Sequence, residues 1–432
     1  MRRIWIGTAA LVLASAACGE PGVDDTTAVD ETPTSSAEKP EPVEEPDLLF
    51  AGSFGGVTVF DPDPPGIVLD TRPAVPSQQG NAVVRTVARF DGTEVSAVDP
   101  ATGSVQWSQL IDEPMELRVA ALDGSAAVLG PVRPLDVEIP GRAETVLTVL
   151  RGNDERRDYT LSGNFEPETF THDGSQIVVV EYLPALAPDR YSVRLLDLPT
   201  GDVREVFDAH GGARQPMEGT ARTQLYSPDG TRLYTYYQIE GDPYVEANWH
   251  GHPEGPFYAF VHVLDLEEGW AHCVELPQPF GTGAALEPAL ATSADGQQLY
   301  VTDAGLGLVA EIDTDRLAVD RTEQLAPEGS HVSAAATVSG DELWVALDDE
   351  VMAVDVRTLR PSASFTVPGF VTAVRGDSRR ERLYLAIDDR IDVYDRSGQR
   401  LERAVITGGP FTYADPRDVP ISAIRDGVKC AC

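Results

Sequence analysis

Short runs in which apolar and polar residues alternate follow one another from residue 48 to residue 409, and clusters of Gly, Asp and Pro separate them. The clearest unit is LYSPDGTRLYTYYQ at residues 225–238. Pro228 pre-sets one turn dihedral and Asp229-Gly230 tolerates the positive φ of a short hairpin, so this stretch predicts two strands joined by a tight turn. No convincing amphipathic helix interrupts the pattern, which is typical of an all-β fold.

The hairpin unit recurs as a strand, a D-G turn, an apolar strand, a second turn and a third strand that ends in Asp. Clear copies occupy residues 169–197, 225–265, 291–313, 338–355 and 375–395, and more diverged copies occupy residues 48–61, 84–99 and 119–150. Eight copies at a period of about 45 residues indicate β-propeller blades, because a ring of small sheets buries the faces that a single sheet leaves exposed. The count favours eight blades.

Five of the third strands end in an aspartate, at Asp197, Asp265, Asp313, Asp355 and Asp395. An Asp at the start of a turn accepts hydrogen bonds from the backbone N–H groups that follow it. These residues fall at equivalent outer turns of different blades, so we expect them to shape turns and not to form a ligand set.

Several short motifs resemble known propellers. SPDG at residues 227–230, DGQQLYV at 295–301 and AVDPATG at 97–103 resemble the bacterial YVTN and WD40-like families, and DPATGSVQ at 99–106 resembles a quinoprotein-like blade. The resemblance covers residues 48–409 and implies a propeller, most often of seven blades, without fixing a function. The expected fold is thus a seven- or eight-bladed β-propeller, with residues 410–432 as a tail in which PISAIR (420–425) closes the ring onto the first blade.

The N-terminal residues have the pattern of an export signal. Arg2 and Arg3 precede an apolar run at residues 4–14, which is shorter than the ~20 residues that a spanning helix needs and is typical of a secretory signal. The small residues before Cys18 resemble a bacterial lipobox. The resemblance implies removal of residues 1–17, diacylglyceryl transfer to Cys18 with palmitate among the acyl groups, and anchoring to the cell membrane or outer membrane.

Residues 18–47 are rich in Glu, Asp, Thr, Ser and Pro and contain little to bury, so we expect a disordered acidic tether. The domain beyond it then faces the periplasm or the cell exterior. The whole chain has 33 Lys and Arg against 70 Asp and Glu, a net charge of -37. Phosphate binding needs clustered basic residues, so this charge excludes nucleic acid as a partner. We expect a monomer that binds a protein or a small ligand.

The longest insertion, residues 239–256, contains His250 and His252 together with Asp242, Glu246 and Trp249. His-x-His with a carboxylate suits Zn or Cu if a third ligand converges, and the alternative is a solvated loop that contacts a partner. Shorter insertions at residues 130–142 and 183–190 occupy the equivalent point of the two preceding blades. Insertions at the same point of three adjacent blades predict that one rim of the propeller is raised there.

Three cysteines remain after Cys18, namely Cys273, Cys430 and Cys432. Export permits disulfides. The prediction is a bond from Cys273 to Cys430 or Cys432 that pins the C-terminal tail. A strained Cys430–Cys432 bridge and metal binding by the C-x-C pair are the alternatives that the odd count leaves open.

No catalytic motif stands out, since the sequence lacks a nucleophile elbow, a P-loop and a C-x-x-C pair. A bound quinone would require a ring of Trp and acidic residues, whereas Trp107 and Asp99 are isolated, and no cofactor is expected. We therefore expect a membrane-anchored, extracytoplasmic binding platform without catalytic activity. The alternative is an extracytoplasmic enzyme, or a propeller that binds a metal or quinone as an oxidoreductase does.

Overall fold

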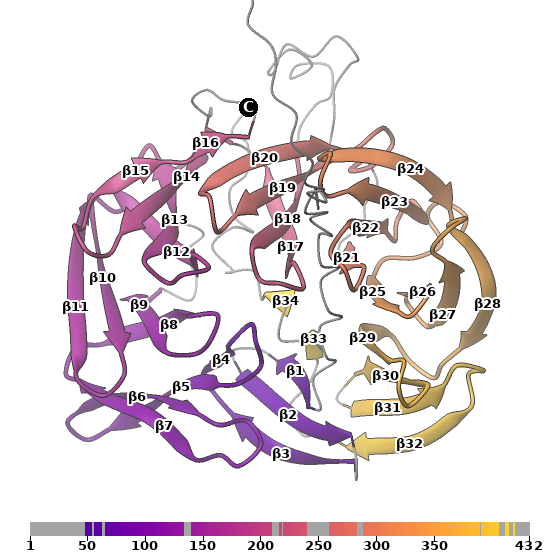
Figure 1. Cartoon of the computed structure of the whole chain (residues 1–432), viewed down its shortest axis with the longest axis horizontal. Helices are drawn as coiled ribbons and strands as arrows, with labels where there is room; N and C mark the ends of the chain where they lie inside the picture. Colours follow the sequence, from indigo (N-terminus) through magenta and orange to yellow (C-terminus); the bar gives the residue numbers. More distant parts are fainter. Residues whose placement is uncertain are drawn as a thin grey trace, which may run out of the picture. The chain divides into compact units, whose positions relative to one another are not determined.

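The computed structural model describes residues 48–53, 56–62, 65–133, 140–209, 216–217, 219–239, 259–282, 288–388, 390–405, 411–413 and 418–419. All of them belong to one compact unit, residues 42–432. The regular secondary structure of this part is β-strand throughout, and it includes no helix of the length and hydrophobicity that a membrane crossing requires. The described strands form eight sheets arranged in a ring, an eight-bladed β-propeller (Figure 1), which confirms the blade count that the repeat favours.

The first four blades are four-stranded antiparallel sheets. From the innermost strand outward, blade 1 contains β33 (Phe411–Tyr413), β1 (Leu49–Ser53), β2 (Gly56–Pro62) and β3 (Pro65–Thr71). Blade 2 contains β4 (Ala74–Pro76), β5 (Val83–Arg89), β6 (Gly92–Val98) and β7 (Val105–Ile111). Blade 3 contains β8 (Met115–Ala120), β9 (Ala126–Pro131), β10 (Glu144–Arg151) and β11 (Glu155–Ser162). Blade 4 contains β12 (Asn164–Phe170), β13 (Gln176–Leu183), β14 (Arg190–Asp197) and β15 (Val203–Glu205).

Blade 5 is a six-stranded sheet, with β34 (Asp418–Val419), β17 (Thr220–Tyr226), β18 (Arg232–Gln238), β19 (Ala259–Asp265), β20 (Trp270–Glu275) and β16 (Phe207–Asp208). Blade 6 contains β21 (Ala289–Thr292), β22 (Gln298–Asp303), β23 (Leu308–Asp313) and β24 (Ala318–Gln324). Blade 7 contains β25 (Ala334–Ser339), β26 (Glu342–Leu347), β27 (Glu350–Asp355) and β28 (Arg360–Thr366). Blade 8 contains β29 (Val371–Asp377), β30 (Arg382–Ile387), β31 (Arg390–Asp395) and β32 (Arg400–Val405).

The hydrophobic core is divided among the blade interfaces. Val179 of β13 and Val128 of β9 belong to one cluster between blades 3 and 4, while Leu233 of β18 and Leu195 of β14 belong to the next, between blades 4 and 5. Eight such clusters connect each blade to its neighbour, including blade 8 to blade 1. Every sheet therefore buries both faces, as a closed ring requires.

The C-terminal segment completes the ring. Strand β33 pairs antiparallel with β1, with Gly52 opposite Tyr413, so a C-terminal strand becomes the innermost strand of the N-terminal blade and covers its edge. Strand β34 pairs with β17 of blade 5, four blades further around the ring, and Figure 1 shows both short strands at its centre. The expected closing segment, residues 420–425, lies outside the described residues; the strand that pairs with blade 1 is residues 411–413.

Aspartates shape the turns as the sequence predicts. In the hairpin at 225–238, Gly230 has φ of 71° and the Asp229 carboxylate accepts the backbone N–H of Thr231 at 3.0 Å. The five strand-ending aspartates each accept backbone N–H groups of the following turn at 2.6–3.0 Å; they are Asp197, Asp265, Asp313, Asp355 and Asp395. Their role in the fold is therefore to accept hydrogen bonds from the backbone N–H groups of the turns.

The propeller has two faces with different connections. The turn face consists of the turns between the first and second and between the third and fourth strands of the blades, such as 171–175, 227–231, 293–297, 99–104, 198–202 and 314–317. The loop face consists of the connections between second and third strands and between successive blades. Its described residues include 90–91, 132–133, 140–143, 184–189, 239, 276–282, 288, 325–333, 348–349 and 367–370. Residues 132–133 and 140–143 of blade 3, 184–189 of blade 4 and 239 of blade 5 are the described parts of the three long insertions, and they lie on the loop face.

Candidate functional site

The loop face carries exposed apolar side chains. Among the described residues, the large hydrophobic side chains that are exposed and lie outside strands are Phe90, Val132, Leu186, Val332 and Phe370. All five stand on loop-face connections, and within the described turns of the opposite face no large hydrophobic side chain is exposed. They come from separate connections around the ring, and their restriction to one face makes the loop face the better candidate for an interaction surface.

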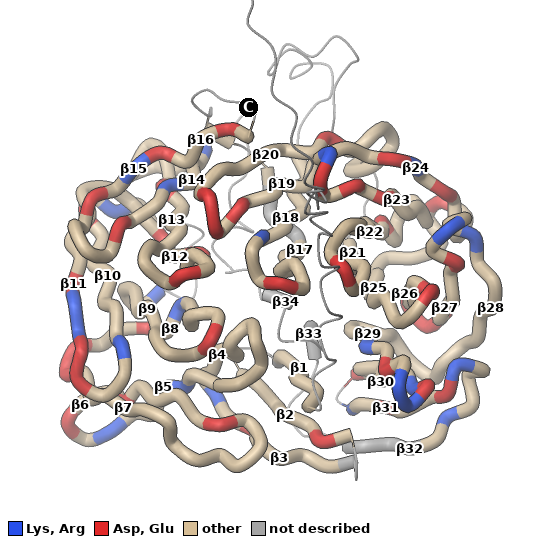
Figure 2. Tube along the Cα trace, viewed as in Figure 1, with Lys and Arg blue, Asp and Glu red and all other residues tan. Residues whose placement is uncertain are grey.

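The turn face is acidic, and Figure 2 shows Asp and Glu recurring around the ring. Several of the carboxylates there accept hydrogen bonds from their own turns. The backbone N–H of Thr102 lowers the pKa of Asp99, that of Thr200 lowers the pKa of Asp197, and that of Arg316 lowers the pKa of Asp313. These three aspartates are therefore ionised at neutral pH, and their oxygens already accept hydrogen bonds from their own turns.

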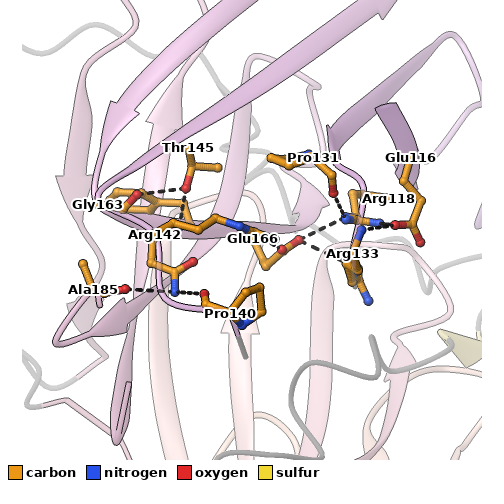
Figure 3. Close-up of polar contacts among 12 residues, drawn as sticks. Glu116, Arg118, Pro131, Arg133, Pro140, Arg142, Thr145, Gly163, Glu166 and Ala185 are labelled. Carbon is orange, nitrogen blue, oxygen red and sulfur yellow. Dashed lines mark hydrogen bonds and ion pairs between the residues drawn. The ribbon is translucent and has the colours of Figure 1, made fainter. Parts of the chain in front are cut away.

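A buried ion cluster lies at the base of the loop face between blades 3 and 4 (Figure 3). Its centre is Glu166 of β12, whose side chain is 4% exposed. Arg142 donates from Nη1 to Glu166 Oε1 at 2.8 Å, and Arg118 of β8 donates from Nε to Oε2 at 3.1 Å. Arg133 approaches less closely, with Nη2 3.8 Å from Glu166 Oε2. Arg118 and Glu166 lie on the innermost strands of their blades, so the cluster connects two blades beside the centre of the ring.

A second carboxylate completes the cluster at its exposed side. Glu116 of β8 lies 2.7 Å from Arg118 Nη1 and accepts the backbone N–H of Arg133 at 3.1 Å. Arg118 Nη2 also donates to the carbonyl oxygen of Pro131. Although burial acts to raise it, the Arg118 guanidinium holds the pKa of Glu116 below its usual value. Both ends of the 132–143 insertion are thus tied to β8 and β12 by charge-assisted hydrogen bonds.

The insertions of blades 3 and 4 also contact each other directly. The Arg142 backbone N–H donates to the carbonyl of Ala185 at 2.8 Å, and Asn164 Nδ2 donates to the carbonyl of Pro140 at 2.8 Å. A Cβ added at Gly141 would lie 2.1 Å from the Leu186 carbonyl oxygen, so only glycine allows this approach. The described ends of the two insertions are therefore fixed, and Leu186 is held on a braced backbone.

One histidine–carboxylate pair lies elsewhere on the loop face. His331 Nδ1 is 3.3 Å from Asp348 Oδ2, and Asp348 also accepts the backbone N–H groups of Val332 and Ser333 at 3.1–3.3 Å. The carboxylate is occupied in closing the 325–333 connection onto blade 7. The pair therefore orders a loop, and it resembles only the orienting half of a catalytic triad. Within the described residues no three His, Cys, Asp or Glu side chains are grouped to hold a metal ion.

Most residues that the sequence singled out lie outside the described residues. This applies to Cys18, Asp242, Glu246, Trp249, His250, His252, Cys430 and Cys432. Cys273 lies on β20, half-buried and opposite His262 of β19, and it packs against the core between blades 4 and 5. The disulfide and metal predictions therefore stay predictions.

Sequence reasoning missed the ion cluster. No local motif marks it, because Arg118 and Glu166 are 48 residues apart and meet only through the packing of two blades. A usable signal was present in the strands themselves: MELRVA and NFEPETF carry charges inside segments expected to be innermost and buried. A charge in such a strand requires a partner from the neighbouring blade.

No protein-family model matches the chain, and no curated protein matches its sequence. Solved structures match by fold. Apo AztD from Citrobacter koseri superposes with a TM-score of 0.52 at 13% identity, covering 85% of this chain and 97% of that one. A second structure of Citrobacter koseri AztD gives 0.50 at 12% identity, covering 85% and 96%. The dihydro-heme d1 dehydrogenase NirN in complex with DHE gives 0.49 at 15% identity, covering 90% and 76%. At these identities the likeness concerns the propeller fold alone.

Proposed function

We propose that this protein is a membrane-anchored, extracytoplasmic β-propeller that binds a protein or ligand partner through its loop face. The observation that carries the proposal is that the exposed apolar loop residues of the described chain are restricted to that face, while the described turns of the opposite face have none; they are Phe90, Val132, Leu186, Val332 and Phe370. Apolar side chains on a rigid scaffold lose little conformational entropy on association, which favours binding.

The ion cluster supports the same role. A binding surface made of loops needs those loops held in place before the partner arrives. Glu166 and its three arginines fix the base of the 132–143 insertion, and the backbone contact from Arg142 to Ala185 extends this support to the insertion that carries Leu186. The contacts between blades 3 and 4 therefore support the proposed role as a binding platform.

Anchoring through Cys18 would set the geometry of binding. A tether of residues 18–47 reaches at most about 100 Å when fully extended, so the loop face would search a limited zone next to the membrane. Cys18→Ala should release the propeller into the soluble fraction and remove the lipid mass from the mature N-terminus. Mass spectrometry and cell fractionation check this, and retention of Cys18→Ala in the membrane without lipid would contradict the anchor.

The partner proposal is tested by in-cell crosslinking and capture from membranes with two matched leucine variants. Leu186 is 70% exposed on the loop face, and Leu110 is 51% exposed on β7 at the outer edge of blade 2. We expect Leu186→Ser to reduce recovery of the captured partner several-fold and Leu110→Ser to leave it unchanged, with both variants folded. Equal recovery with both variants, or loss only with Leu110→Ser, would contradict a loop-face site.

A further inference from the structure

One turn on the loop face is hydrogen-bonded to two of the connections that present exposed apolar side chains. It is the turn between β26 and β27 of blade 7, and its first residue, Asp348, is buried and has φ of 53°. A left-handed backbone is uncommon for a residue with a side chain, and it persists where surrounding contacts hold it. The contacts of Asp348 therefore show what this turn does.

The side chain of Asp348 fixes the connection that arrives from blade 6. The backbone N–H groups of Val332 and Ser333 donate to its Oδ1 at 3.2 and 3.1 Å, and His331 Nδ1 lies 3.3 Å from its Oδ2. The Asp348 backbone N–H donates in turn to the carbonyl of Ser333 at 3.1 Å. One residue thus contacts three successive residues of this connection, and Val332 in their middle is 52% exposed.

The backbone of the same turn fixes the connection that leaves for blade 8. The Asp348 carbonyl accepts the N–H of Val371 at 2.7 Å, and the Asp349 carbonyl accepts the N–H of Val367 at 2.9 Å. Phe370 stands between these two bonded positions and is 55% exposed. Both apolar tips, at residues 332 and 370, therefore belong to connections that are hydrogen-bonded to one turn, which keeps their backbones in fixed places relative to each other.

We propose that Asp348 is a positioning residue for partner binding, and that it holds Val332 and Phe370 as one apolar contact unit. The inference rests on the proposed function, since these two residues belong to the proposed loop-face surface. The occupant is a protein that covers both tips with apolar side chains of its own, because exposed apolar groups contribute to association by packing against such partners. Holding the tips in place beforehand lowers the entropy lost on binding.

Asp348→Gly separates the carboxylate from the backbone. Glycine adopts positive φ readily and keeps the N–H and C=O groups of position 348, so only the bonds to the carboxylate are lost. Hydrogen exchange of the full chain should then be at least about tenfold faster at the N–H groups of Val332 and Ser333, because hydrogen bonds to a charged acceptor are lost. The N–H of Val371, which donates to the backbone carbonyl, should exchange as in the wild type.

Two further variants calibrate this result. Asp348→Asn keeps an acceptor oxygen and tolerates the left-handed backbone, so it should restore slow exchange. Glu381→Gly is the matched control, because Glu381 has φ of 54° and is exposed on the turn face; it should leave both N–H groups unchanged. Unchanged exchange in Asp348→Gly would overturn the inference. Faster exchange throughout blade 7 would assign Asp348 to folding alone and would overturn it as well.

Photo-crosslinking in cells tests the role in binding, with a reactive amino acid at position 332 or, on blade 4, at position 186. The yield at 332 divided by the yield at 186 corrects for overall occupancy. Asp348→Gly should lower this ratio several-fold, whereas Asp348→Asn and Glu381→Gly should keep it. Crosslinks from 186 with an unchanged ratio in Asp348→Gly, or with none from 332 in the wild type, would overturn the inference alone. Crosslinks from neither position in the wild type would contradict the proposed function and the inference with it.

Discussion

The turn face and the loop face are made by the same strands, yet they use charge differently. On the turn face the strand-ending aspartates serve their own turns within a few residues, as Asp355 does with the N–H groups of Arg357 and Thr358. Pairs between blades also occur there, such as Glu342 with Arg396, but their side chains are about 30% exposed. On the loop face the charges act across blades, as Glu166 does with Arg118. Repeated local hydrogen bonds thus shape the turns, while a buried cluster of charges from distant segments holds the base of a loop-face insertion.

The largest expected difference between the faces comes from one substitution made on each. Glu166→Gln leaves three arginines without their central carboxylate and should lower the free energy of unfolding by about 3–5 kcal/mol, since breaking a buried ion pair leaves uncompensated charge. Glu342→Gln is the control, because Glu342 pairs with Arg396 at 2.7 Å and is 31% exposed; it should cost no more than about 1 kcal/mol. Urea titrations measure both, and equal costs would contradict the distinction between buried and surface pairs.

A smaller effect is expected when a turn loses its acceptor. Asp265 accepts the N–H groups of Glu267 and Glu268 at 3.0 and 2.6 Å. Asp265→Ala removes both bonds and should cost about 1–2 kcal/mol, whereas Asp265→Asn keeps an acceptor and should cost less than half of that. Thermal unfolding compares them. Asn as damaging as Ala would mean that the charge of Asp265, and not its acceptor, holds the turn.

The smallest effect is the acid sensitivity of single turn carboxylates. The pKa values of Asp99, Asp197 and Asp313 are lowered in the folded protein by backbone N–H groups. Each therefore contributes stability above the ordinary Asp pKa of about 3.9, and this contribution is lost as the pH falls through the lower folded value. Urea midpoints should decline below about pH 4. Asp313→Asn should make that decline shallower, and an unchanged slope would contradict the role of Asp313.

Much of the fold was predictable because its signals are local. Asp229 and Gly230 define a turn within four residues, and eight copies of that unit give the blade count. The positions of the three insertions also followed from repeat order. The six-stranded blade 5 and the pairing of residues 411–413 with β1 were not predictable, because short strands far apart in sequence carry no periodic signal of their own.

The candidate site was predictable only in part. The sequence placed the working region at the 239–256 insertion of blade 5, of which only residue 239 is described, so that prediction stays a prediction. Of the described apolar tips, Val132 and Leu186 stand on the two shorter insertions. The Glu166 cluster could not be predicted, because its members come from three separate segments that meet only when two blades stack. The structure does not describe His250, His252 or the C-terminal cysteines. Metal analysis tests the predicted role of the two histidines, and non-reducing peptide mapping tests that of the cysteines.

The most direct measurement is photo-crosslinking in cells with a reactive amino acid placed on either face of the anchored protein. Leu186 and Phe370 represent the loop face, and Asp154 and Asp315 represent exposed positions of the turn face. The loop-face binding model predicts that a discrete crosslinked partner forms from positions 186 and 370 and not from positions 154 and 315. Crosslinks to the same partner from the turn-face positions alone, or equally from both faces, would contradict it.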